Sequence, residues 1–253
     1  VAAGITAGFT GRELTALLGR AGCPADFMEL HKGLTRVNIK ILPKGRPETA
    51  LNGGGPEIAL GDLRPLEDRL ARLQKGDLLV LAGSVPGSLP EEVYARLMGA
   101  APRGVETVVD TSGPALIEAV RKGPFLIKPN LEELGEVFGE RLEGTEAAIA
   151  HARRLQELGA RNVAVTLGGG GALLLTEEGR LLERAALPGR EVSSVGAGDS
   201  FVAGFLYGYI KERDMDKALD WAVCAGAATA FSEGIAQGEQ VEALYRRHFL
   251  IEN

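Results

Sequence analysis

The residues best suited to chemistry in this chain form a short glycine turn, Gly196-Ala197-Gly198-Asp199. Two glycines around one alanine let the backbone turn tightly, so that consecutive N–H groups can face a common point. A helix predicted over residues 200–212 would add its positive N-terminus, and the site would then favour an anion. Asp199 could accept a proton from an attacking hydroxyl, or it could simply cap the helix. The turn alone therefore predicts an anion site and leaves the role of Asp199 open.

Regular elements surround this turn and must position it. Apolar runs predict strands at 77–82, 107–110, 125–127 and 162–166, a hairpin over 172–175 and 180–183, and a short strand just before Ser194. Helical spacing predicts helices at 91–100, 114–121, 131–139, 145–158, 200–212 and 215–230. The run 77–82 is continuously apolar, which is typical of a strand buried on both faces. This order predicts an α/β fold with a doubly wound, mostly parallel sheet, helices on both faces and ligands beyond the carboxyl ends of the strands.

The part of the chain before residue 77 has a different pattern. A helix is predicted at 12–21, and the stretch 35–41 then alternates strictly, as a strand with one polar face does. Its two faces carry Val37, Ile39 and Ile41 on one side and Arg36, Asn38 and Lys40 on the other. The three glycines at 53–55 close this region and could form a hinge.

The bulk composition argues against several classes of protein. The net charge is −6 and no long cluster of Lys or Arg occurs, so we expect no nucleic-acid partner. No apolar run approaches the roughly 20 residues of a membrane span, so we expect no membrane insertion. The two cysteines, Cys23 and Cys224, lack the spacing of a metal site and suit reduced thiols of a cytoplasmic protein.

Five further motifs occur in order along the chain: TRVNIKI (35–41), TALNGGGPEI (49–58), LAGSVPGSLP (81–90), DTSGPAL (110–116) and IKPNLEEL (127–134). Together with the GAGD turn they resemble the ribokinase-like (PfkB) carbohydrate kinase family, and within it the subgroup of 1-phosphofructokinases and tagatose-6-phosphate kinases. The resemblance runs from about Gly4 to about Phe249. It implies a ribokinase-like α/β core over 1–30 and 53–253, and a small β-sheet lid that includes 31–52.

The resemblance also implies an activity, the ATP-dependent phosphorylation of a ketohexose monophosphate. Fructose 1-phosphate, giving fructose 1,6-bisphosphate, is the first expectation, and tagatose 6-phosphate is the alternative within the same chemistry. From other classes, a non-catalytic sugar-phosphate or nucleotide-binding protein would lack a base or a metal-orienting acid, whereas Asp199 and Glu133 are both present. A dinucleotide oxidoreductase would need a G-x-G-x-x-G fingerprint after a first strand, and the chain has none.

The catalytic and nucleotide-binding residues are carried over from the family motifs. Asp199 would be the base, and the amides of Gly196, Ala197 and Gly198 would stabilise the phosphoryl group in transfer. The nucleotide-binding residues implied are Lys128, Asn130, Thr166, Gly168, Gly171 and Gly198. Glu133 and Asn130 would hold Mg²⁺ through water, although a glutamate at an acidic helix start is otherwise explained by the helix dipole.

The sugar side of the site is also carried over from the family. Arg36, Asn38 and Ser84, together with Asp199, would bind the phosphosugar, and an arginine suits bidentate contact with phosphate. Asp110 ends one strand and Asp77 precedes another, and either could line the cleft without any local feature requiring it. The family's first strand, its substrate-binding aspartate and its GGKG-x-N-x-A element are absent, so we expect that a segment precedes the sequence given. A homodimer through the lid is expected, and a monovalent cation could bind near residues 192–195 and 230–234.

Overall fold

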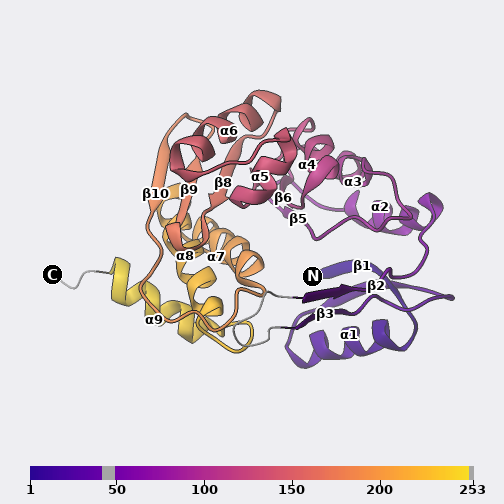
Figure 1. The fold of residues 1–253 in the computed structure, drawn as a ribbon. Coiled ribbons are helices and arrows are strands. Elements are labelled where there is room, and N and C mark those ends of the chain that lie inside the picture. Colours follow the sequence, from indigo (N-terminus) through magenta and orange to yellow (C-terminus); the bar gives the residue numbers. More distant parts are fainter. Residues whose placement is uncertain (42–48, 251–253) are drawn as a thin grey trace. The chain divides into compact units, whose positions relative to one another are not determined.

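The computed structural model describes residues 1–41 and 49–250, and the chain divides into two compact units. The first unit comprises Val1–Lys75 and Val85–Gly104, and the second comprises Gly76–Ser84 and Val105–Asn253. Figure 1 shows the elements of both units coloured along the sequence. Within the predicted lid, 31–52, the stretch 42–48 lies outside the described residues, and the division into lid and core remains a prediction.

The first unit contains two small sheets and a few helices. Strands β1 (Ala2–Ala7) and β2 (Ala25–Leu30) are parallel neighbours joined by α1 (Gly8–Arg20), while β3 (Asn38–Ile41) and β4 (Thr49–Asn52) form an antiparallel pair. The remaining elements are the 3₁₀ turn η1 (Leu60–Leu63) and the helices α2 (Arg64–Leu70) and α3 (Val93–Ala100). The strand predicted at 35–41 is confirmed only for its last four residues.

Thr35 holds the segment before β3 against the junction of β1 and α1. Its Oγ1 accepts a hydrogen bond from the amide of Ala7 at 2.8 Å, and its own amide donates to the Ala7 carbonyl at 2.9 Å. The Thr10 hydroxyl donates to the Thr35 carbonyl at 2.8 Å. On the other side, a Cβ on Gly53 would lie 3.1 Å from the Val37 carbonyl oxygen, so the glycine cluster approaches this segment closely. The backbone on both sides of Arg36 is therefore held.

The second unit is built on a six-stranded sheet. Its strands are β5 (Leu78–Ala82), β6 (Glu106–Asp110), β7 (Leu126–Ile127), β8 (Asn162–Thr166), β9 (Ala172–Leu175) and β10 (Leu181–Arg184). They lie in the order β10-β9-β8-β7-β6-β5; β5 to β8 are parallel, and the hairpin of β9 and β10 is antiparallel. The mostly parallel sheet and the hairpin were both predicted.

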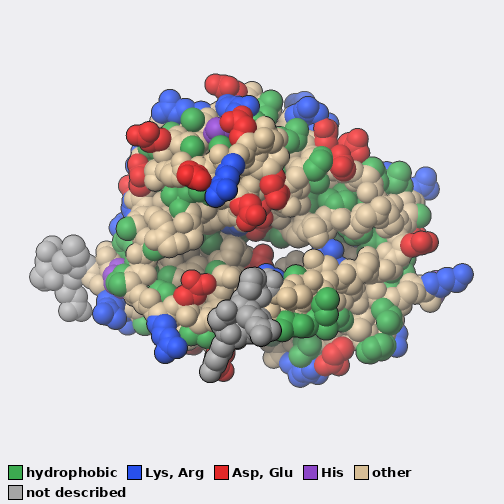
Figure 2. All heavy atoms as spheres, in the orientation of Figure 1, with side chains coloured by type: hydrophobic (Ala, Val, Ile, Leu, Met, Phe, Trp, Pro, Cys, Tyr) green, Lys and Arg blue, Asp and Glu red, His purple; other side chains and the backbone are tan. Residues whose placement is uncertain are grey.

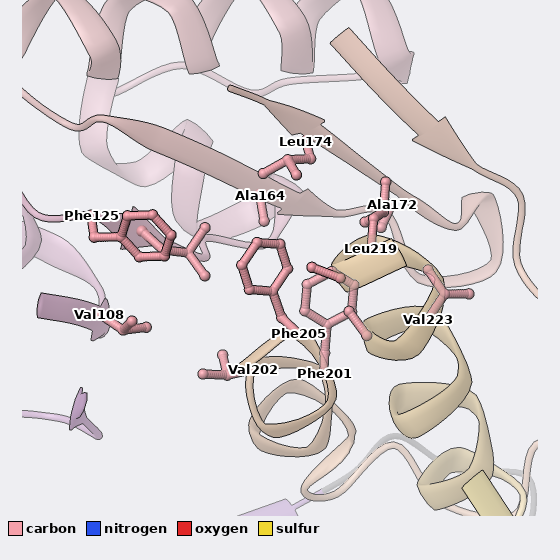
Figure 3. Packing of buried hydrophobic residues seen from close by; sticks show 13 residues of the cluster. Val108, Phe125, Ala164, Ala172, Leu174, Phe201, Val202, Phe205, Leu219 and Val223 are labelled. Carbon is pink, nitrogen blue, oxygen red and sulfur yellow. The ribbon is translucent and has the colours of Figure 1, made fainter. Parts of the chain in front are cut away.

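Helices cover both faces of this sheet (Figure 1). One face is packed by the group α4 (Gly113–Val120), α5 (Leu131–Phe138) and α6 (Gly144–Leu158), and the other by α7 (Ala197–Glu212) and α8 (Met215–Ala230). Figure 3 shows the second interface, where side chains of the strands meet those of α7 and α8. Phe201 and Phe205 of α7 are buried in this interface. The doubly wound arrangement is therefore present.

Helices α7 and α8 pack very closely. A Cβ on Gly204 would lie 2.5 Å from the carbonyl oxygen of Trp221, so only glycine allows this approach of the two backbones. Helix α8 also packs against α9 (Gly238–Phe249). The rings of Trp221 on α8 and Tyr245 on α9 stack with their centroids 3.9 Å apart and 9° between their planes.

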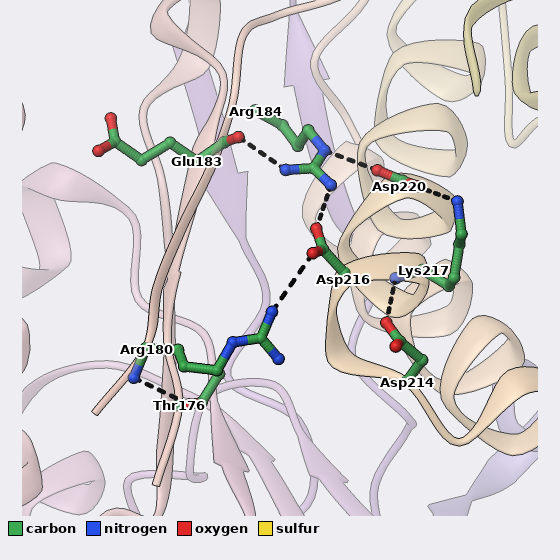
Figure 4. Close-up of polar contacts among 8 residues, drawn as sticks. All are labelled: Thr176, Arg180, Glu183, Arg184, Asp214, Asp216, Lys217 and Asp220. Atoms are coloured by element: carbon green, nitrogen blue, oxygen red, sulfur yellow. Dashed lines mark hydrogen bonds and ion pairs between the residues drawn. The ribbon is translucent and has the colours of Figure 1, made fainter. Parts of the chain in front are cut away.

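A network of charged side chains joins β10 to α8 (Figure 4). Arg184 donates from Nε to Oδ1 of Asp220 at 2.6 Å and also binds Asp216. Asp220 is only 2% exposed, and Lys217 adds a second positive charge 3.5 Å from its Oδ2. Because a buried carboxylate without a partner is costly, this network fixes β10 against α8.

Three sequence predictions are wrong. Strand β5 is not buried on both faces, since Val80 is 42% exposed; β5 is the edge strand of the described sheet and pairs only with β6. No strand precedes the GAGD turn either, because residues 185–196 form neither helix nor strand, and α7 begins at Ala197 instead of residue 200.

The surface carries charges of both signs. On the face drawn in Figure 2, acidic and basic side chains are interspersed. Among the described helices, none combines the length and the apolar character that crossing a bilayer demands.

Candidate active site

A cavity of about 360 Å³ lies in the second unit, where the strands β5, β6 and β7 end. Its volume is within the range usual for small-molecule sites. Seven residues predicted from the motifs line it: Ser84, Lys128, Asn130, Glu133, Gly196, Gly198 and Asp199. Gly83, Asp110, Thr111 and Ser112 complete the lining. The fold thus gathers side chains from motifs that are more than 100 residues apart in sequence.

The first turn of α7 presents unused backbone donors to this cavity. Gly196 is the N-cap residue with φ of +78°, and a Cβ there would meet Ile235 Cδ1 at 2.3 Å, so the turn requires glycine. Within the described part of the chain, the amides of Gly196 and Gly198 have no hydrogen-bond acceptor, whereas that of Ala197 donates to the Ser194 carbonyl at 3.2 Å. Free amides at a helix N-terminus form a site for an anion.

Asp199 does not cap this helix. The N-cap is Gly196, and Asp199 lies inside the first turn, where it lines the cavity. The interpretation of Asp199 as a helix cap is therefore wrong, and its carboxylate is placed at the edge of an anion site. A carboxylate in this position can accept a proton from a bound hydroxyl.

Hydrogen bonds between α7 and α8 hold the turn in place. The buried hydroxyls of Ser200 and Thr229 lie 2.7 Å apart, and Thr229 Oγ1 also accepts from the amide of Ala236 at 3.1 Å. The amides of Val192 and Ser193 donate to the Ala230 carbonyl at 2.8 and 3.2 Å. The two loops predicted to lie near a monovalent cation are therefore directly connected.

Asn130 and Glu133 are joined as the N-terminal cap of α5. The Asn130 Oδ1 accepts from the Glu133 amide at 2.8 Å, and the Glu133 Oε2 accepts from the Asn130 amide at 2.8 Å. This reciprocal capping box follows from their three-residue spacing. The capping box fixes both side chains at the cavity. It occupies Oε2 of Glu133, and the other carboxylate oxygen of Glu133 takes no part in it.

A buried ion pair lines the cavity and was not predicted. Lys128 Nζ is 3.2 Å from Oδ1 of Asp110, and both side chains are largely buried. Burial raises the pKa of the Asp110 carboxyl; the charge and hydrogen bond of Lys128 oppose this rise, and the carboxylates of Glu133 and Asp199 add to it. The position of Asp110 at the end of a strand was the one signal that pointed to the site.

The predicted nucleotide residues of the 166–171 turn do not line this cavity. The amide of Thr166 donates a hydrogen bond to the carbonyl of Pro129 at 3.2 Å, and Pro129 stands between the lining residues Lys128 and Asn130. Thr166 is therefore bonded to the segment that lines the cavity. Gly168 is the first residue of the 3₁₀ turn η2 (Gly168–Gly170), and Gly171 follows the turn directly. Gly171 has φ of +94°, and a Cβ there would lie 2.0 Å from the Arg184 carbonyl oxygen. The packing of the backbone therefore requires glycine at this position.

Arg36 and Asn38, the predicted phosphate-binding pair, belong to the first unit. Asn38 Oδ1 accepts a hydrogen bond from the Gly53 amide at 3.2 Å, which ties β3 to the glycine cluster. Their part in substrate binding remains a prediction.

Three carboxylates and one lysine give the cavity its charge. They are Asp110, Glu133, Asp199 and Lys128, and Lys128 is the single basic side chain among the described lining residues. No group of three or more His, Cys, Asp or Glu within the described ranges 1–41 and 49–250 is arranged to hold a metal ion.

Comparison with known proteins decides the family. Residues 2–241 match the sequence profile described as pfkB family carbohydrate kinase. The chain belongs to this family. The predicted carbohydrate kinase activity and the ribokinase-like α/β fold are thereby confirmed.

Members of the pfkB family with assigned substrates include similar proteins from Bacillus. The 1-phosphofructokinase of Bacillus subtilis is 42% identical over 245 residues, which cover 96% of this chain and 79% of that protein. The D-tagatose-1-phosphate kinase of Bacillus licheniformis is 32% identical over 243 residues, covering 95% and 79%. Among solved structures, phosphofructokinase-2 from Escherichia coli in complex with potassium has a TM-score of 0.88 at 27% identity, covering 97% of this chain and 81% of that one.

Proposed function

We propose that this pfkB family kinase transfers the γ-phosphoryl group of ATP to the C6 hydroxyl of D-fructose 1-phosphate, giving fructose 1,6-bisphosphate. The observation that carries the proposal is the cavity in which Asp199 lies beside the free amides of Gly196 and Gly198. The choice of fructose 1-phosphate is supported by the 42% identity to a 1-phosphofructokinase.

The chemistry assigned to the first turn of α7 is positioning, charge stabilisation and proton removal, which are the main requirements of phosphoryl transfer. Asp199 accepts the proton of the C6 hydroxyl as the new bond from its oxygen to the γ-phosphorus forms. The bond from that phosphorus to the β–γ bridging oxygen breaks, and ADP leaves with the electron pair. The amides of Gly196 and Gly198 stabilise the charge on the phosphoryl oxygens, and Ala197 contributes through the conformation of the turn.

Nucleotide binding is assigned to residues near the ends of the strands. Lys128, Asn130 and Gly198 bind the phosphates, while Thr166, Gly168 and Gly171 lie on the nucleotide side. The Lys128 amine is the group best suited to the phosphates, because it is the single basic side chain among the described lining residues.

Magnesium suits the donor set of the cavity. Its oxygen ligands would be Asn130 and Glu133, through water, and Mg²⁺ commonly keeps several waters and needs few protein ligands. The three carboxylates around one lysine also repel a polyphosphate, so a divalent cation is required to offset the negative charge. When bound, the ion neutralises charge on the phosphates.

Binding of the sugar phosphate is assigned to Arg36, Asn38 and Ser84. Ser84 lies in the cavity lining, and the backbone on both sides of Arg36 is held by Thr35 and Gly53. A guanidinium and a hydroxyl can together satisfy several phosphate oxygens.

A second candidate substrate is D-tagatose 1-phosphate. It is favoured by the 32% identity to a kinase of that sugar, and it carries its phosphate on the same carbon as fructose 1-phosphate. Tagatose 6-phosphate, which presents the C1 hydroxyl instead, completes the set of acceptors to be compared.

The remaining parts of the proposal concern ions, assembly and location. A monovalent cation binds near 192–195 and 230–234, and support comes from the potassium complex of the similar phosphofructokinase-2. Two copies pair through the lid, and the protein acts in the cytoplasm, where its two cysteines stay reduced.

The test is an ADP-release assay with Mg-ATP and a panel of acceptors. Fructose 1-phosphate, tagatose 1-phosphate, tagatose 6-phosphate, fructose 6-phosphate and unphosphorylated fructose would be compared by kcat/KM. The highest value is expected for fructose 1-phosphate. The absence of turnover with every phosphosugar would disprove the proposed function, and a preference for unphosphorylated fructose would disprove the phosphate site.

A further inference from the structure

The buried pair of Asp110 and Lys128 follows from the register of two neighbouring strands. In the parallel pair β6 and β7, Val109 lies opposite Ile127, so Asp110, the last residue of β6, and Lys128, the residue after β7, lie side by side at the cavity. The side chains are 13% and 6% exposed, and Nζ is 3.2 Å from Oδ1. Either charge alone at this depth would be strongly unfavourable, so each charge is stabilised by the other.

The pair also determines where the lysine amine lies. A Cβ on Gly198 would be 3.3 Å from Lys128 Nζ, which places the amine against the first turn of α7. The free amides of Gly196 and Gly198 belong to the same turn. A long lysine side chain has many rotamers, and a fixed carboxylate partner removes most of them.

We propose that Asp110 is a positioning residue of the phosphoryl-transfer site: its carboxylate holds the amine of Lys128 at the first turn of α7, where the ATP phosphates bind. The inference rests on the proposed function and assigns Asp110 no contact with the reacting atoms. It explains why a third carboxylate lies in a cavity that receives anions.

The inference implies a dependence on pH. The charged groups facing Asp110 are Lys128, Glu133 and Asp199, and burial together with the two carboxylates raises the Asp110 pKa while Lys128 opposes the rise. Because a carboxyl with a raised pKa is ionised only above that pKa, falling pH protonates Asp110 and releases Lys128. The acid limb of ATP affinity in the wild type therefore includes the titration of Asp110.

The test is a double-mutant cycle with Asp110→Asn, Lys128→Met and the double variant. Calorimetric titration with Mg-ATP measures affinity without any sugar, and steady-state assays add kcat and KM for fructose 1-phosphate. We expect Asp110→Asn and Lys128→Met each to weaken ATP binding by about tenfold or more, because a charge-assisted contact is lost. The double variant should be no weaker than Lys128→Met, and KM for the sugar should change little.

Additive losses in the cycle would overturn the inference, since Asp110 would then act independently of Lys128. Unchanged ATP affinity in Asp110→Asn would overturn it as well. In the pH series, the acid limb of ATP affinity should move to lower pH in Asp110→Asn, and an unmoved limb would count against the assignment. Because ATP titration needs no acceptor, an inactive wild type would disprove the proposed function and leave the cycle decisive.

Asp220→Asn is the matched control for loss of a buried ion pair. Asp220 is 2% exposed, pairs with Arg184 at 2.6 Å in the same unit and does not line the cavity. Both asparagine variants should unfold at lower urea than the wild type, but only Asp110→Asn should lose ATP affinity. An equal loss in folded Asp220→Asn would assign the effect of Asp110 to general destabilisation.

Discussion

Asp199 and the glycines before it do different work, although they are consecutive in sequence. Gly196 has a left-handed backbone that turns the chain, and the amides on either side of Ala197 stay free of protein acceptors. Asp199 lies within the first turn of the helix and lines the cavity. The backbone groups therefore supply the anion site, and the side chain supplies the base.

Substitution of Asp199 separates these two contributions. Asp199→Asn keeps the shape of the first turn but removes the proton acceptor, so kcat should fall by about 10²- to 10⁴-fold. ATP affinity, measured by calorimetry, should stay within a few fold of the wild type, because the amides are unchanged. A variant that retains near-full turnover would show that Asp199 is not the base.

The same residues show what sequence reasoning can reach. The glycines, Asp199 and the Asn130–Glu133 pair could be predicted because each belongs to a short motif whose geometry is local. Asp110 could not be assigned, because its partner Lys128 is 18 positions away and meets it only through the register of β6 and β7. Contacts set by strand pairing leave no local signal.

The same contrast holds for the elements. The sheet and helices of the second unit were predictable because their apolar residues repeat with clear strand or helix periods. Helix α9 was missed, although Val241, Leu244, Tyr245 and Phe249 form an apolar stripe that packs against Trp221 and Cys224; Tyr245 is the one fully buried residue among its twelve. The predicted start of α7 is three residues too late. Its first residue, Ala197, stands between two glycines, and glycines in sequence indicate a turn instead of a helix.

The connection between the β1–α1 junction and β3 should matter for substrate binding. Thr35→Val preserves the shape of the side chain but leaves the Ala7 amide without its acceptor. The backbone before Arg36 should then loosen, and KM for fructose 1-phosphate should rise by about tenfold. KM for ATP should not change.

The control for this prediction is Thr15→Val. The Thr15 hydroxyl donates to the Gly11 carbonyl within α1 and has no recorded contact with β3. Kinetic constants of Thr15→Val should equal those of the wild type. A matching rise in KM for ATP in Thr35→Val would contradict a role confined to the sugar.

The charged network between β10 and α8 should be a major source of stability. Arg184→Met leaves Asp220 buried with only Lys217 at 3.5 Å, so the free energy of unfolding should fall by about 3 kcal/mol. Urea denaturation followed by far-UV circular dichroism measures this loss. Arg246→Met, which removes an exposed pair with Glu242 on α9, is the comparison and should cost about 0.5 kcal/mol or less. Equal effects of the two substitutions would contradict the importance of burial.

At the scale of the whole molecule, the exposed sheet of β3 and β4 is the clearest candidate for contact with a second copy. Ile39 and Leu51 pair across this sheet and are 51% and 54% exposed, an apolar surface that a protein seldom leaves in water. We expect the wild type to be a dimer by light scattering coupled to gel filtration. Ile39→Lys should yield monomers, because a buried lysine in the interface would be unpaired.

Lys40→Glu is a control for charge in the same strand, since Lys40 lies on the opposite face from Ile39. It should leave the dimer intact. A wild type that is monomeric at every concentration, or an Ile39→Lys variant that stays dimeric, would contradict the proposed interface.

The stacking of Trp221 on Tyr245 gives the protein a built-in optical reporter. Trp221 is the sole tryptophan of the chain, and it lies between α7 and α9 among aromatic rings, away from the cavity lining. Its emission spectrum therefore senses whether α9 stays docked and is indifferent to direct contact with nucleotide. Any change in that fluorescence on adding ATP would be a measure of strain passed through α7 and α8 to the C-terminal helix.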